Sequence, residues 1–191
     1  MRRRVVVTGL GMVTPLGTGV EKNWEAVCAG RSGIRRIQKF DASPFPCRIA
    51  GEVPDFRSED FMDRQQVRRF DIFVHYAMAS ARMAMEDSGL SITDVNAHRV
   101  GCLTGSGLGG LAMLEHYHQV LLEKGPRRIS PFFIPGMIAN MAPGLIAIEF
   151  GAKGPNLSIE PACAASPHAV GESFRLIREG IADAMITGGS E

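Results

Sequence analysis

The sequence predicts an α/β domain built on a largely parallel sheet. Short β-branched or apolar runs alternate with longer helical patterns along its 191 residues. Such alternation is typical of parallel strands joined by right-handed helical crossovers. The hydrophobic content of 45% is ample for one core. The expected order is strand 5–8, helix 21–28, helix 68–87, strand 100–104, helix 108–124, helix 137–150, strand 156–160, helix 167–179 and strand 183–187.

The N-terminal third contains the first strand and helix and then an irregular stretch. Residues 5–8 form a continuous β-branched run, which predicts a buried strand. Helix 21–28 carries Trp24 and Val27 on one side. Prolines and glycines break up residues 32–54, where we expect a surface excursion with a short strand near residue 49.

Three long helical patterns follow. The clearest is 68–87, whose apolar residues recur at three-four spacing and which Gly89 closes. Helix 108–124 follows strand 100–104 and ends before Gly125. Pro143 lies inside helix 137–150 and should kink or restart it.

Composition excludes several classes of function. A formal net charge of +1 argues against a dedicated nucleic-acid binder. The four cysteines lack the spacing of a metal site and fit reduced thiols in a cytosol-like compartment. No segment approaches the ~20 apolar residues of a membrane span. The basic start resembles a signal peptide, but Gly9 and Gly11 interrupt the apolar run that follows.

The turn between strand 156–160 and helix 167–179 has the pattern of a nucleophile site. Cys163 lies there among small residues, and Pro167 suits a first helical turn. A helix N-terminus favours the thiolate and offers N–H groups to a developing oxyanion. The alternative is that Cys163 is a small buried hydrophobic residue. His168 is five positions along the helix, so the two side chains diverge and a general base must come from elsewhere.

A glycine-rich stretch, Gly105-Ser-Gly-Leu-Gly-Gly110, satisfies the dinucleotide-binding pattern G-x-G-x-x-G. It follows a predicted strand and opens a helix, so a dinucleotide-binding domain is a rival reading. The strand is not the first of its unit, however. Glu123, at the distance expected of the ribose-binding acid, falls at a helix end.

Several segments together resemble the beta-ketoacyl-acyl-carrier-protein synthases, and most of all the type II elongation enzymes of fatty acid synthesis. The central segment is Glu160-Pro-Ala-Cys-Ala-Ala-Ser-Pro-His-Ala-Val-Gly171. The resemblance implies a thiolase-like fold, a five-layered α-β-α-β-α sandwich when complete. Residues 1–191 would be its N-terminal half. The C-terminal half, with two catalytic histidines and a lysine, would be absent from this chain. The other matching segments are 4–12, 105–110, 126–135 and 182–191.

The resemblance also implies an activity and its residues. Cys163 would be the nucleophile of a decarboxylative condensation that lengthens fatty acids by two carbons. No metal or organic cofactor would be needed beyond the phosphopantetheine arm of acyl carrier protein. The acyl pocket would include Gly107, Leu108 and Phe133, the last from a loop that reaches the neighbouring subunit of a homodimer. The location would be cytoplasmic.

A cluster of basic residues would bind the acidic carrier protein. Arg68 and Arg69 match the family's docking positions, whereas a third position, commonly Lys, is Gln65. From the residues alone, such a cluster is equally a solvated surface. The full set is Arg64, Arg68, Arg69, Arg127 and Arg128, with the last two expected in a loop near the active-site entrance.

Three positions depart from the family pattern around the nucleophile: Pro161, Ser166 and Pro167. Pro161 restricts Glu160 to extended geometry and removes one N–H, which would stiffen or perturb the turn. The rival enzymes are a thiolase or a polyketide ketosynthase. The non-enzyme rival is a chain-length-factor-like subunit, and the presence of Cys163 argues against it.

Overall fold

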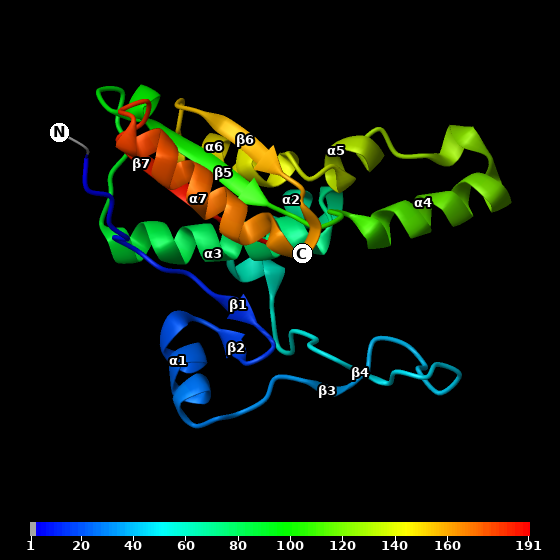
Figure 1. Ribbon diagram of the computed structural model, residues 1–191. Helices are drawn as coiled ribbons and strands as arrows, with labels where there is room; N and C mark the ends of the chain where they lie inside the picture. Colours follow the sequence, from blue (N-terminus) through cyan, green and yellow to red (C-terminus); the bar gives the residue numbers. More distant parts are fainter. Residues whose placement is uncertain (1–2) are drawn as a thin grey trace.

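The computed structural model describes residues 3–191 and is organised around a three-stranded parallel sheet (Figure 1). Its order is β6-β5-β7. Cys102 in the middle strand lies opposite Asn156 on one side and Ile186 on the other. Three of the expected strands and their parallel arrangement are thus confirmed. Their bounds are β5 Val100–Gly105, β6 Asn156–Ile159 and β7 Ala184–Gly189.

Helices cover both faces of this sheet, as its apolar sequence requires. One face packs against α7 (Ala165–Arg178) and the other against α3 (Ile72–Ser88) and α6 (Met141–Phe150). Successive side chains of β5 point to opposite faces of the sheet and so divide the core into two parts. Leu103 packs with α7, and Cys102 packs with α3 and α6. Burial raises the pKa of the Cys102 thiol to about 12.

The long helix expected over 68–87 is two helices. α2 (Arg64–Arg69) ends at Phe70, whose backbone is extended, and α3 begins at Ile72. The break follows from Asp71, which accepts a hydrogen bond from the Ile72 N–H (2.6 Å) and caps the new helix. The apolar face of α3 is buried as predicted, and Gly89 ends the helix in the left-handed region at φ 62°.

Asp71 also caps a second helix. Its other carboxylate oxygen accepts from the Met113 N–H at 2.7 Å, in the first turn of α4 (Leu111–Lys124). The Asp71 N–H donates to the carbonyl of Gly136 at 3.1 Å. The side chain is only 8% exposed, so its partners have little access to water. Asp71 therefore joins three helical segments, two through its carboxylate and the segment of Gly136 through its backbone N–H.

We expect Asp71→Ala to lower the free energy of unfolding by about 3 kcal/mol, since two partly buried N–H groups in two different helices lose their acceptor. Asp63→Ala is the matched control. Asp63 caps α2 through Gln65 and Gln66 but is exposed. Its loss should cost about 1 kcal/mol. Urea denaturation monitored by circular dichroism measures both, and equal losses would contradict the double-cap role.

A helical hairpin extends from the carboxyl end of β5 and projects away from the sheet (Figure 1). It comprises α4, η3 (Pro126–Arg128) and α5 (Phe133–Met137). α4 starts three residues later than predicted, because Gly109 has φ +80° and stands outside helical geometry. The helix expected over 137–150 begins four residues later than predicted, as α6 (Met141–Phe150), and Met137 is the last residue of α5. Pro143 lies in the first turn of α6, where it needs no kink.

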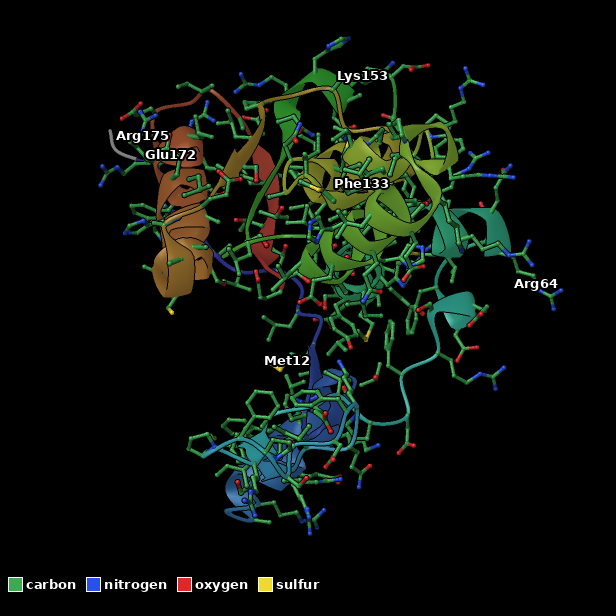
Figure 2. All side chains as sticks on the ribbon, turned by 90° about the vertical axis from the view of Figure 1, so that its right-hand side faces the viewer. Met12, Arg64, Phe133, Lys153, Glu172 and Arg175 are labelled. Atoms are coloured by element: carbon green, nitrogen blue, oxygen red, sulfur yellow. The ribbon has the colours of Figure 1, made fainter. Side chains whose placement is uncertain are left out.

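Residues 13–56 form a separate N-terminal excursion that lies apart from the sheet in both views (Figures 1 and 2), whereas Gly9 and Gly11 lie against α3. The expected strand at 5–8 is wrong: this segment is extended but unpaired, and Val6 and Val7 are 63% and 76% exposed. Helix 21–28 is confirmed, but it buries Asn23 and Ala26 instead of Trp24 and Val27. The elements are β1 Val13–Thr14, β2 Gly17–Thr18, α1 Val20–Cys28, β3 Arg35–Arg36, β4 Ile49–Ala50 and η1 Ser58–Asp60.

An arginine pair fastens the start of β5 to the start of β7. Arg99, at the end of η2 (Ala97–Arg99), donates to Asp183 at 2.8 and 3.1 Å and also to the carbonyls of Gly180 and Ile181. Arg3 donates to the same carboxylate at 2.8 Å. Hydrogen bonds from Arg99 and then Arg3 lower the pKa of Asp183 to about 2. Across residues 3–191, no helix combines the length and apolarity of a membrane span.

Candidate active site

The turn that holds Cys163 is sharp and its backbone is strained. β6 ends at Ile159, and a single 3-10 turn, η4 (Ala162–Ala164), leads directly into α7. Ala162 adopts φ +50°, in the left-handed region that residues with a Cβ rarely enter. Strained residues of this kind cluster at functional turns. The structure thus places Cys163 in the predicted strand-to-helix turn, on a nucleophile-elbow geometry.

Two strand-end glycines allow α7 to sit directly on the sheet. A Cβ on Gly105, the last residue of β5, would lie 2.4 Å from the backbone carbon of Ala165. A Cβ on Gly189, the last residue of β7, would lie 2.5 Å from the Cβ of Ser166. Any side chain at either position would push the N-terminus of α7 away. Sequence reasoning missed this role, although both glycines end strands beside the cysteine turn.

Its place at a helix N-terminus distinguishes Cys163 from Cys28 and Cys102. Cys163 is exposed at the N-terminal, partly positive end of a 14-residue helix. Cys28 is also exposed but is the last residue of α1, at the C-terminal end of its helix. Cys102 is buried. The Cys163 N–H precedes the first hydrogen bond of the turn, from the Ala164 N–H to the Pro161 carbonyl, and so has no partner within the helix.

The predicted acyl-pocket residues are separated in the structure. Leu108 is 71% exposed and lines an open cavity of about 560 Å³, together with residues 137–140, 156–158 and 160. Phe133 does not line this cavity. It begins α5, not a loop as expected, and packs its ring against Tyr117 at a centroid distance of 5.0 Å. A second cavity, of about 490 Å³, lies in the N-terminal excursion and contains no residue of the cysteine turn.

The glycine-rich loop is engaged by a carboxylate. Glu191 accepts hydrogen bonds from the N–H groups of Gly107 (2.6 Å) and Leu108 (3.1 Å) and from the Ser106 hydroxyl (2.8 Å). In a dinucleotide-binding domain such N–H groups face a pyrophosphate. A fixed carboxylate at that place would repel it, and Glu123 lies within α4 away from any strand tip. The dinucleotide reading of this loop is therefore wrong.

The predicted basic residues form two separate groups. Arg68 and Arg69 end α2, and the Arg69 guanidinium lies 4.1 Å from the ring centre of Phe132. Arg64 begins the same helix and extends outward, away from Phe133 (Figure 2). Arg127 and Arg128 lie in η3, beyond the far end of α4. Because 14 helical residues span about 21 Å, this second group is remote from the first turn of α4.

Comparison with known proteins identifies relatives of the whole chain. The family profile described as "Beta-ketoacyl synthase, N-terminal domain" matches residues 2–191. The "3-oxoacyl-[acyl-carrier-protein] synthase 2" of Coxiella burnetii (strain RSA 493 / Nine Mile phase I) is 52% identical over 190 residues. That of Synechocystis sp. (strain ATCC 27184 / PCC 6803 / Kazusa) is 50% identical over 190 residues. Both alignments cover 100% of this chain and 46% of the relative, so the chain spans about half the length of the curated relatives it matches.

Solved structures agree with the sequence relatives. The ishigamide ketosynthase/chain length factor superposes with a TM-score of 0.85 at 33% identity, over 100% of this chain and 48% of that chain. A ketosynthase solved with its type II polyketide acyl-carrier protein gives a TM-score of 0.82 at 25% identity, over 100% and 52%. These structures confirm the thiolase-like fold, of which the chain spans about one half. The chain therefore belongs to the beta-ketoacyl synthase N-terminal domain family.

Proposed function

We propose that the protein containing this chain is a 3-oxoacyl-acyl-carrier-protein synthase that elongates fatty acids, with Cys163 as its nucleophile. The single observation that carries the proposal is the strained turn at Ala162, which presents an exposed Cys163 at the N-terminus of α7. Two curated relatives, at 50% and 52% identity, bear this activity in their names, which supports the proposal.

The first step is transfer of the acyl group. The Cys163 sulfur attacks the carbonyl carbon of an acyl thioester carried on the phosphopantetheine arm of acyl carrier protein. The tetrahedral intermediate collapses by breaking the bond to the carrier's sulfur, which leaves as a thiolate and takes up a proton. The Cys163 N–H supplies one donor for the oxyanion of that intermediate. No metal or further cofactor enters this step.

The second step forms the carbon–carbon bond. Malonyl-acyl-carrier-protein loses carbon dioxide, and the electron pair left on its α-carbon attacks the acyl group on Cys163. The Cys163 sulfur leaves, and the product is a 3-oxoacyl thioester two carbons longer. Decarboxylation requires charge stabilisation, which we assign to the histidines of a C-terminal half that completes the fold around residues 1–191.

We further propose that Arg64, Arg68 and Arg69 on α2 bind the acidic carrier protein. Their support is the position of α2, which contacts α5 at the base of the projecting hairpin. Arg127 and Arg128 would reach the carrier from the far end of that hairpin. Long-range attraction to an acidic partner accelerates association more than it strengthens the final contact.

We expect the double reversal Arg68→Glu and Arg69→Glu to weaken carrier binding by about tenfold or more at low salt. The loss should fall mainly on the association rate and shrink as salt is added. Reversal of Arg35 and Arg36, an exposed pair in β3, is the control for net charge. Surface plasmon resonance at two ionic strengths measures both variants, and equal losses for the two pairs would remove α2 from the docking surface.

Two further features are proposed on the same basis. A homodimer would cover the exposed edge of β6 and the leucines of α4, of which Leu122 is 72% exposed. In it, Phe133 of one protomer would approach the acyl pocket of its partner. We also propose a cytoplasmic location, since the exposed thiols of Cys28, Cys47 and Cys163 suit a reducing compartment.

The proposed activity is tested with the full synthase, acyl-carrier substrates of several lengths and malonyl-acyl-carrier-protein. Mass spectrometry should show a single two-carbon extension and, before malonyl addition, an acyl group on Cys163. The alternative is a polyketide ketosynthase, which the solved neighbours favour. Repeated condensation without reduction, giving a poly-oxo chain, would establish that alternative.

A further inference from the structure

We infer that Glu191 is a positioning residue that fixes the loop 106–110 and, through Leu108, sets which acyl chains the enzyme accepts. This inference rests on the proposed function, because acyl selection has meaning only for a condensing enzyme. Glu191 was not among the predicted site residues.

The Glu191 carboxylate gathers three donors of one loop. It accepts from two consecutive backbone N–H groups, those of Gly107 and Leu108, and from the hydroxyl of Ser106. The Ser106 oxygen in turn accepts from the Gly109 N–H at 3.1 Å. Consecutive N–H groups that converge on one anion form a concave nest, and hydrogen bonds to an anion are among the stronger ones in proteins.

The loop needs this carboxylate because its glycines allow the backbone many conformations. Gly109 has φ +80°, and three of the five residues from 106 to 110 are glycines. A Cβ on Gly107 would lie 3.3 Å from a Glu191 oxygen, so glycine leaves the room that the carboxylate uses. A glycine-rich loop without such an anchor would sample many conformations.

The same contacts tie the loop to the strands that frame Cys163. The Ser106 N–H donates to the carbonyl of Ile159, the last residue of β6, at 3.2 Å. Ser190 makes two further bonds. Its N–H donates to the carbonyl of Gly105 at 3.0 Å, and the Ser190 hydroxyl donates to the carbonyl of Phe73. Glu191 therefore connects the end of β7 to a loop already attached to the cysteine turn.

Leu108 connects the fixed loop backbone to the choice of acyl chain. Its N–H is held by Glu191, while its side chain is 71% exposed and lines the cavity beside β6. The position of the side chain follows from the backbone that carries it. Freeing the backbone would let Leu108 withdraw from or close over the cavity, which changes the acyl lengths that fit more than it changes attack by Cys163.

The test is Glu191→Gln in the full synthase. The amide keeps the size of the side chain but turns an NH₂ group toward N–H donors. We expect hydrogen–deuterium exchange of the Gly107 and Leu108 amides to accelerate by about tenfold, as loss of a charged hydrogen bond implies. The ratio of kcat/KM for long over short acyl substrates should change by about threefold or more. Acylation of Cys163 by the shortest substrate should stay within about twofold of the parent.

Glu52→Gln is the matched control. Glu52 also accepts from two consecutive N–H groups, those of Gln38 and Lys39, but in the N-terminal excursion. It should leave both readouts unchanged. Ser106→Ala, which removes one of the three donors, gives a milder second variant if Glu191→Gln does not fold, and it should move both readouts in the same direction.

The two readouts separate the possible failures. Faster exchange with an unchanged substrate ratio would reduce Glu191 to a structural residue and overturn the inference. An unchanged hydrogen–deuterium exchange rate at Gly107 and Leu108 would show that Glu191 does not hold the loop, and would also overturn the inference. If the unsubstituted enzyme condenses nothing, the proposed function fails, while the exchange rates still decide whether Glu191 holds the loop.

Discussion

Replacing Cys163 with alanine should abolish condensation by the full synthase, with a loss of about a thousandfold or more in kcat. The acyl group has no other acceptor once the sulfur is gone, because the reaction proceeds through a thioester at this atom. The side chain is exposed, so the free energy of unfolding should change by less than about 0.5 kcal/mol. Steady-state assay and thermal unfolding of the same preparation measure the two effects.

Labelling of the parent enzyme provides the control. A cysteine-directed acylating reagent should modify Cys163 first, and peptide mapping should find Cys102 unmodified while the fold is intact. Cys102 is buried and burial raises its pKa to about 12, so it offers almost no thiolate at neutral pH. Cys28→Ala should retain full activity. Faster modification of Cys28 or Cys47 than of Cys163 would refute the assignment.

The second large effect is expected for residues 1–191 expressed alone, which should associate and fail to condense acyl chains. Many large apolar side chains are exposed in the described structure, among them Val7 at 76%, Trp24 at 67% and Ile148 at 77%. Exposed apolar surface on this scale drives association. Condensation should be absent because malonyl decarboxylation depends on groups that we assign to the other half.

Light scattering and a malonyl decarboxylation assay test this expectation, with the full synthase as the reference. We expect concentration-dependent mass for residues 1–191 and a defined dimer for the reference. Cys163 in the isolated chain should still be open to acylation. A stable monomer with near-normal condensation would disprove the need for a second half, and with it the view that two halves share the chemistry.

The parts that the sequence predicted well are those set by local pattern. β5, β6, β7 and α7 follow from apolar runs and helical spacing, and the turn that holds Cys163 follows from them. The strand expected at 5–8 was wrong because a strand needs a hydrogen-bonding neighbour, which a run of valines does not supply. The break at Asp71 was missed because a capping side chain interrupts an apolar period without altering it.

The site was predictable in chemistry and less so in geometry. The small residues around Cys163 indicated a tight turn, but the positive φ of Ala162 depends on how α7 meets the sheet. The hydrogen bond between Glu191 and Gly107 joins residues 84 positions apart, and no local sequence pattern predicts such a contact. The basic residues were grouped by charge, whereas the length of α4 separates Arg127 from Arg68.

The central position of β5 has a consequence for synthesis of the chain. This strand is fully buried, yet its partners β6 and β7 follow it by about 50 and about 80 residues. At the translation rates of cells, β5 therefore leaves the ribosome roughly 3–10 s before β6 does and roughly 4–16 s before β7. During that interval Val100 to Leu103 is an apolar segment with two unpaired edges. Ribosome-associated chaperones that bind extended apolar segments should meet this stretch first, and helices α3 and α4 can form while it waits.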